Sequence, residues 1–174
     1  LSKPMPIIYK IKFKVLIIIL SLISFANSED IKKLGKFKDW EVLLLVNDSG
    51  KVCFAQSIPI LQSPKTTKRE ARLFVTFRPA EKISDEVSVT SGYEYNAQNS
   101  IIAKSGKAKY KFDISQEGFA WIASSKVEKK IIKKMKKASR IMITGYNKSG
   151  SQTIDHYSLM GFTKAYKKAK KNCS

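Results

Sequence analysis

Apolar and polar residues alternate in short segments along most of the chain after residue 39. This period of two is typical of β-strands with one buried and one exposed face, and turn-forming Asn, Asp, Ser, Gly and Pro residues separate the segments. The pattern predicts strands over residues 40–46, 51–58, 72–78, 86–92, 100–104, 107–114, 118–123, 140–146 and 151–157. Many short strands of this kind are typical of a β-sandwich or a barrel.

The clearest alternation lies in residues 107–114, where Ala108, Tyr110, Phe112 and Ile114 are separated by polar residues. We expect these four side chains to face the core and the intervening ones to face solvent. Residues 59–68 contain two prolines and mostly polar side chains, and we interpret them as a loop.

Two segments depart from this period and predict short amphipathic helices. Ser125 followed by Glu128 fits a capping box, and Val127, Ile131, Ile132 and Met135 then share one helix face. The second helix is expected to start from a Ser158 cap, because apolar residues recur at spacings of three and four from that point. These are Leu159, Phe162, Tyr166, Ala169 and Cys173.

The first 28 residues have the composition of a secretory signal peptide. Four lysines precede an apolar segment at 15–25, which ends in small residues at 26–28. A segment of this length is too short to span a bilayer, which needs about 20 apolar residues. We therefore predict a signal peptide over residues 1–28, cleavage after Ser28, and a single domain over residues 29–174; an uncleaved anchor is the alternative.

The chain is strongly basic, with 33 Lys and Arg residues against 14 Asp and Glu, for a net charge of +19. Removal of residues 1–28 takes away four lysines and no acid, which leaves +15. Only four of the basic residues are arginine, the side chain that binds phosphate in a bidentate manner. Abundant lysine is thus explained most simply by solvated faces, and a polyanion-binding surface is the alternative.

The chain has two cysteines, Cys53 and Cys173. Cysteines of exported proteins usually pair, and the predicted second helix turns Cys173 toward the core, so we predict a disulfide between them. Two free thiols or an intermolecular bond are the alternatives. With a single histidine and no CxxC motif, the chain predicts no zinc site, no thioredoxin-type site and no cofactor.

Four segments together resemble the invasion associated locus B family of exported alphaproteobacterial proteins. They are residues 37–42 (FKDWEV), 52–56 (VCFAQ), 85–93 (DEVSVTSGY) and 158–165 (SLMGFTKA), with a final Cys173. The resemblance implies an immunoglobulin-like β-sandwich, a place in the periplasm or outer envelope of a Gram-negative bacterium, and no enzymatic activity. It also implies a link to host-cell invasion in some relatives. Many members have further cysteines that this chain lacks.

His156, which follows Asp155, is the only histidine of the chain and therefore the only candidate for the catalytic histidine of an exported hydrolase. Adjacent residues of a strand face opposite sides, so Asp155 is not expected to orient the His156 ring, and no GxSxG motif is present. A structural histidine is the preferred interpretation, and we predict that the protein is not an enzyme. Trp40 and Trp121 are expected to be core residues.

The lysine-rich first helix is the candidate for contact with lipopolysaccharide, anionic lipid or nucleic acid. Its basic residues are Lys126, Lys129, Lys130, Lys133, Lys134, Lys136 and Lys137, and a second basic run lies at 164–171. Tyr93, Tyr95, Tyr110 and Trp121 would add stacking surfaces if they were exposed. The sequence therefore predicts an exported envelope protein with a binding or structural role and an unidentified envelope or protein partner. Polyanion binding is the alternative.

Overall fold

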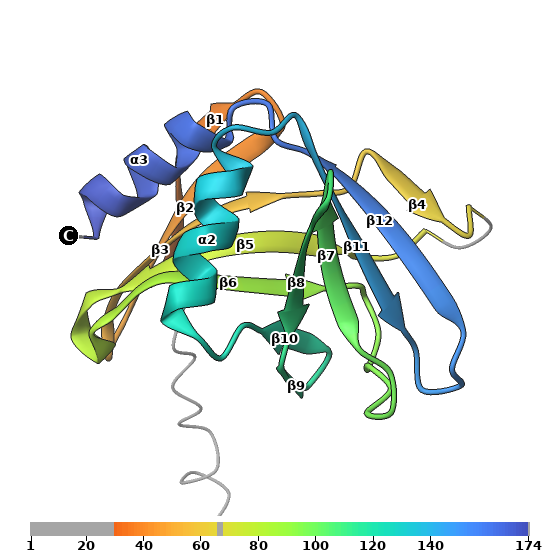
Figure 1. Ribbon diagram of the computed structural model, residues 1–174. Coiled ribbons are helices and arrows are strands. Elements are labelled where there is room, and N and C mark those ends of the chain that lie inside the picture. Colours follow the sequence, from red (N-terminus) through yellow and green to blue (C-terminus); the bar gives the residue numbers. More distant parts are fainter. Residues whose placement is uncertain (1–29, 66–67, 174) are drawn as a thin grey trace, which may run out of the picture.

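The computed structural model describes residues 30–65 and 68–173, which form two antiparallel sheets and two short helices (Figure 1). The larger sheet has seven strands in the order β1 (Asp30–Phe37), β2 (Trp40–Asn47), β3 (Gly50–Ser57), β5 (Arg72–Arg78), β6 (Ile83–Thr90), β10 (Phe119–Trp121) and β9 (Ile114–Gln116). The smaller has five, in the order β4 (Leu61–Ser63), β12 (Gln152–Ser158), β11 (Arg140–Tyr146), β7 (Ile101–Ser105) and β8 (Ala108–Phe112). This confirms a mainly β sandwich with two short helices.

The helices share a layer with the smaller sheet. Helix α3 (Phe162–Asn172) packs on β1, β2, β3 and β5, and helix α2 (Ser125–Met135) packs on β6. In Figure 1, α3 and α2 lie beside the five-stranded sheet, and the seven-stranded sheet runs behind all three. One face of the larger sheet is therefore covered partly by strands and partly by helices.

The core forms between these layers from the inward-facing residues of both. Trp40 is fully buried, lies 4.8 Å from the Phe162 ring, and donates its indole N–H to the carbonyl oxygen of Ser158 at 2.9 Å. On α2, Ile131, Ile132 and Met135 are buried, as the helical pattern predicted, and Val127 is half-buried. All five residues of the predicted apolar stripe on α3 are also buried: Leu159, Phe162, Tyr166, Ala169 and Cys173.

The predicted disulfide is present. Cys53, in the centre of β3, is bonded to Cys173, which directly follows α3, and their Cα atoms lie 5.8 Å apart. The bond fixes the end of the last helix to the middle of the larger sheet. Neither of the alternative thiol states is therefore found in the described chain.

Both helix starts differ from the prediction. Ser124 is the N-cap of α2, no side chain caps this helix, and Glu128 instead accepts the backbone N–H of Val87 at 3.0 Å. The predicted Ser125–Glu128 capping box is therefore wrong. Ser158 ends β12, and α3 is capped by Gly161, which has φ +91°. A Cβ atom at Gly161 would lie 1.8 Å from the carbonyl oxygen of Phe37, so only glycine fits this turn.

Two expected core residues lie on the outer surface. The segment predicted as one strand over 107–114 leaves the smaller sheet after Phe112 and enters the larger one at Ile114, whose side chain is 49% exposed. Trp121 is half-buried and faces away from the core, because it pairs with Ser88 on the outer face of β6. The predicted signal peptide, residues 1–28, lies outside the described residues.

Candidate functional site

The neighbourhood of His156 does not assemble a hydrolase site. Asp155 is fully buried and faces the core, whereas His156 lies on the outer face of β12, opposite Met142 of β11. Both Asp155 carboxylate oxygens accept hydrogen bonds from Arg69. Among the described residues no hydrogen bond reaches the His156 ring, so its neighbours supply neither an orienting acid nor a nucleophile.

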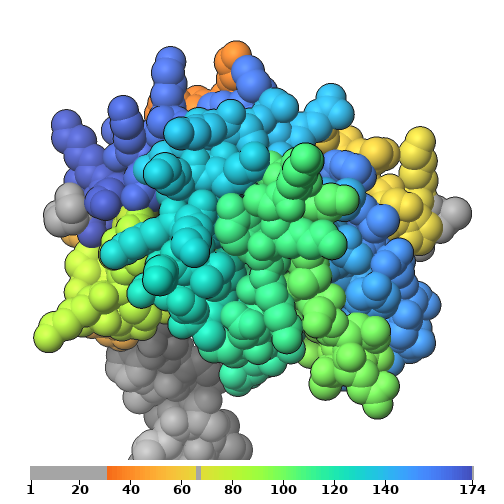
Figure 2. All heavy atoms as spheres, in the orientation of Figure 1, coloured from red at the N-terminus to blue at the C-terminus, as the bar shows by residue number. Residues whose placement is uncertain are grey.

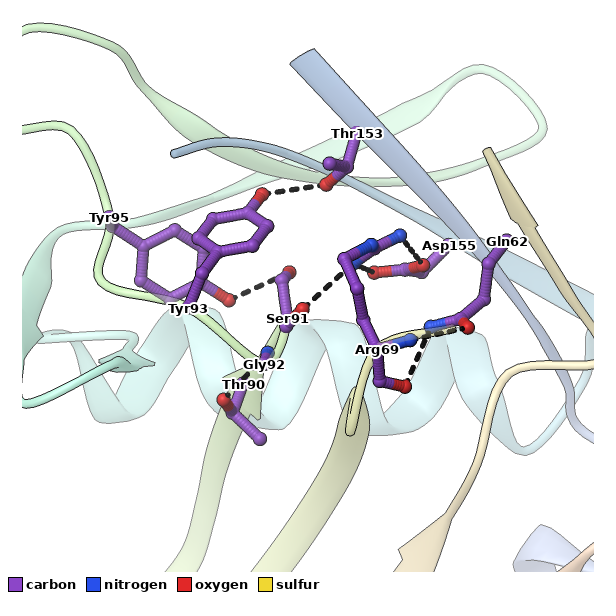
Figure 3. Close-up of polar contacts among 9 residues, drawn as sticks. All are labelled: Gln62, Arg69, Thr90, Ser91, Gly92, Tyr93, Tyr95, Thr153 and Asp155. Carbon is purple, nitrogen blue, oxygen red and sulfur yellow. Dashed lines mark hydrogen bonds and ion pairs between the residues drawn. The ribbon is translucent and has the colours of Figure 1, made fainter. Parts of the chain in front are cut away.

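The Arg69–Asp155 pair is the centre of a cluster of polar side chains inside the sandwich (Figure 3). Arg69, just before β5, meets Asp155 of β12 with N–O distances of 2.5 and 3.0 Å, and it also donates to the carbonyl oxygen of Ser91 at 2.8 Å. The two side chains are 9% and 0% exposed. Gln62 of β4 holds the Arg69 backbone with two hydrogen bonds.

Two tyrosines complete this cluster. Tyr95 donates its hydroxyl hydrogen to Ser91 at 2.9 Å, and the Tyr93 hydroxyl lies 2.6 Å from that of Thr153 (Figure 3). Burial raises the pKa of the Tyr95 hydroxyl, which therefore stays protonated. The cluster joins the segment before β5, the loop after β6 and strand β12. Since its charged groups are paired and closed to solvent, we assign it to stability.

The lysines of α2 project from the surface of the molecule. Of the seven predicted contact residues, Lys126, Lys129, Lys130, Lys133, Lys136 and Lys137 are exposed and Lys134 is half-buried. Lys126, Lys129, Lys130 and Lys133, with Ser125, line a shallow surface groove. None of the seven forms an ion pair with another described residue.

Helix α3 continues this basic surface. Lys136, just after α2, lies with its Nζ atom 3.6 Å from the centre of the Tyr166 ring of α3. Partial burial lowers the pKa of Lys136 despite the opposing effect of Asp85, and Lys170 and Lys167 lower it further. The ends of the two helices are thus close enough for their lysines to repel one another, a cost that a bound anion would relieve.

The smaller sheet adds basic residues that the helical pattern did not indicate. Lys104 of β7 is paired with Lys109 of β8 and with Met142 of β11, so these residues lie in one row on the outer face. Lys111 and Arg140 are also exposed. The alternation that predicted β8 contained this signal, because every polar position of that strand is a lysine.

Helices α2 and α3 and strands β7, β8, β11 and β12 are together called the basic layer here. Its only acidic residues are Glu128 and Asp155, and both are buried. Figure 2 shows α3, α2 and the β7–β8 hairpin adjoining on one face, with long side chains projecting from it. The exposed charges of this layer are therefore of one sign.

The opposite face of the molecule is different, because it carries ion pairs and therefore charges of both signs. On the outer face of the larger sheet, Lys33 contacts Glu41 at 2.6 Å and Arg78 contacts Glu86 at 2.9 Å. These pairs cancel the local charge on this face. The excess of basic residues is thus concentrated on the basic layer.

The sequence suggested Tyr93, Tyr95, Tyr110 and Trp121 as stacking surfaces for a nucleic acid. None of these four rings is exposed on the basic layer. Tyr95 is buried, Tyr93 is bonded to Thr153, and Tyr110 packs against the core. Trp121 is on the outer face of the larger sheet. The basic layer therefore offers point charges without the exposed tyrosine or tryptophan platforms that the sequence suggested.

In the described part of the chain, no group of three or more His, Cys, Asp or Glu residues is placed to bind a metal ion. The described helices are also too short or too polar to cross a membrane.

The family model described as "Invasion associated locus B (IalB) protein" matches residues 40–170. This range covers most of the chain and includes β2, the disulfide-bonded Cys53 and the basic layer apart from the last two residues of α3. No curated protein and no solved structure matches the chain.

Proposed function

The chain belongs to the invasion associated locus B family, and on this basis we propose that it is an exported, non-enzymatic protein that binds in the bacterial envelope through its basic layer. The observation that carries this proposal is the one-sided distribution of charge. Every exposed charged residue in α2, α3, β7, β8, β11 and β12 is basic.

Export is supported by three independent features. The chain has an N-terminal segment with the composition of a signal peptide, a disulfide between Cys53 and Cys173, and the family match. Disulfides persist in the periplasm and outside the cell, whereas the cytosol keeps thiols reduced. We propose the periplasm or the outer envelope as the compartment.

The chemistry of the basic layer favours a phosphate-bearing membrane surface. Lysine is a strongly hydrated point charge that attracts phosphate without fixed geometry, and arginine is rare here. Single-stranded nucleic acid is bound by basic grooves with exposed aromatic rings, and the four tyrosine and tryptophan candidates are not available for this. Lipopolysaccharide and anionic phospholipid both present dense phosphate, and we propose this shared chemistry as the ligand.

The basic layer is expected to bind anionic vesicles in a salt-dependent manner. The protein purified after export should co-sediment with phosphatidylcholine vesicles that contain phosphatidylglycerol or lipopolysaccharide, and not with phosphatidylcholine alone. Changing Lys126, Lys129, Lys130 and Lys133 together to Gln should weaken binding by one to three orders of magnitude at low salt, since each lysine near an anionic surface contributes about 1 kcal/mol.

A matched control removes the same charge elsewhere. Lys32, Lys51, Lys65 and Lys82 are exposed and lie outside the basic layer, so their change to Gln should weaken binding far less. Comparison of binding to the phosphatidylglycerol vesicles with binding to the lipopolysaccharide vesicles then shows which of the two phosphate-bearing lipids the protein prefers. The proposal would be contradicted if both variants lost the same amount of vesicle binding. It would also be contradicted if binding were unchanged between about 50 and 500 mM NaCl.

The family description refers to invasion, and for this chain we propose only the binding step on which such a role would depend.

A further inference from the structure

The outer face of the seven-stranded sheet carries a row of aromatic side chains. Phe54 of β3, Phe74 of β5, Phe119 of β10 and Trp121 of β10 lie in succession, with ring centres 6.0, 6.2 and 6.0 Å apart. Each occupies an outward position, because its neighbours along the strand, such as Leu73 and Val75 beside Phe74, are fully buried. Phe119 is exposed and the other three rings are half-buried, so the row forms an apolar patch on the surface of the sheet. Large contiguous patches of this kind are uncommon on monomers.

Aliphatic residues extend the row toward both edges of the sheet. Leu43 pairs with Phe54, and Ile31 of the edge strand β1 pairs with Leu45. At the other edge, Ile114 of β9 pairs with Trp121. Ile31 and Ile114 are 59% and 49% exposed. The apolar surface therefore crosses the sheet from one edge to the other.

No helix of the described chain covers this face. Helix α3 contacts Trp40, Cys53 and Phe77, which all point into the core, and α2 packs on the inner side of β6 through its buried residues. Arg72 and Arg78 stand on the outer face at outward positions of β5, and both contact acidic residues. The face thus combines aromatic residues and arginine, which are enriched in protein interfaces.

The charges on the outer face of the seven-stranded sheet are compatible with a second copy of the chain as the partner. A chain with a large positive charge repels its own copies wherever the basic layer would be buried, but the outer sheet face carries paired charges of both signs. When two such faces meet about a two-fold axis, each patch contacts the same patch of its partner, and cations and anions at the rim can pair across the axis.

The size of the face also suits a second copy. Five of the seven strands have seven or eight residues and β9 and β10 have three each; with about 3.3 Å per residue and about 4.8 Å between strands, the sheet face covers roughly 700 Å². This area is close to the 800 Å² or so that each partner buries in a stable interface. We propose that two copies of the protein associate through the outer faces of their seven-stranded sheets, with Phe54, Phe74, Phe119 and Trp121 at the centre. The basic layers then remain free on both copies.

Sedimentation equilibrium of the protein purified after export tests this proposal. The parent should have twice the mass of one chain at micromolar concentrations. The association should persist or strengthen as NaCl rises, because salt screens the repulsion between two basic chains. A variant with Ile114→Lys and Phe119→Lys, two positions at least one third exposed in the folded chain, should be monomeric and should keep the circular dichroism spectrum of the folded parent.

The matched control places the same two charges on another surface. Ile58 and Ile60 are 61% and 53% exposed in the segment between β3 and β4, and Ile58→Lys with Ile60→Lys should leave the dimer intact. A monomeric parent would overturn the proposal, as would dimeric Ile114→Lys, Phe119→Lys protein. A dimer that dissociates at high salt would also overturn it, since this behaviour indicates bridging of the basic layers by a polyanion.

Discussion

Replacing Cys53 and Cys173 together by alanine should lower the free energy of unfolding by about 4 to 5 kcal/mol. The disulfide joins residues separated by 120 positions, so its loss restores the conformational entropy of a long loop to the unfolded chain. Both cysteines are nearly or fully buried, and alanine leaves only a small cavity at each position. Guanidinium denaturation, followed by tryptophan fluorescence and circular dichroism, measures the change.

The reduced parent is the control for this prediction. Dithiothreitol should destabilise the parent by nearly the same amount and leave the alanine variant unaffected. Equal stability of oxidised parent and variant would contradict the structural role that we assign to the bond between α3 and β3.

Changing Arg69 to Met should cost about 3 to 5 kcal/mol, the usual result of leaving one partner of a buried ion pair uncompensated. Asp155 is fully buried, and Arg69 donates to both of its carboxylate oxygens and to the Ser91 carbonyl oxygen. No other described side chain replaces these donors. The midpoint of thermal unfolding should fall strongly, although every exposed lysine of the basic layer is unchanged.

The double variant Arg69→Met, Asp155→Leu separates the ion pair from simple loss of packing. Because the buried carboxylate is then removed as well, at least half of the lost stability should return. Vesicle binding of the refolded double variant should equal that of the parent. A double variant less stable than Arg69→Met alone would show that Asp155 has a role apart from its partner.

The sequence pattern predicted two central strands to the residue, and a central strand has hydrogen-bonded neighbours along both of its edges. Strands β5 and β11 have the predicted bounds. The strands that the pattern missed or merged, β1, β4 and β9, all lie at sheet edges. There one side has no neighbour, and alternation weakens: β1 contains an irregularity between Lys33 and Gly35, and β4 has three residues between prolines.

The candidate site was predicted only in part for a related reason. Helical spacing identified the lysines of α2, but the joining of α2, α3 and the smaller sheet into one layer depends on contacts between distant segments, such as Lys136 with Tyr166. The Arg69–Asp155 pair joins residues 86 positions apart, and nothing local indicates it. The aromatic row depends on strand register, which fixes the face on which Trp121 stands.

Lysine footprinting of the membrane-bound protein tests most directly whether the basic layer is the binding face. The exported protein is acetylated with and without anionic vesicles, and modification at each lysine is measured by mass spectrometry. We predict that Lys129, Lys133 and Lys167 are protected several-fold by vesicles, whereas Lys32, Lys51 and Lys82, exposed outside this layer, react equally in both samples. Uniform protection, or protection confined to the second set, would contradict the proposed function.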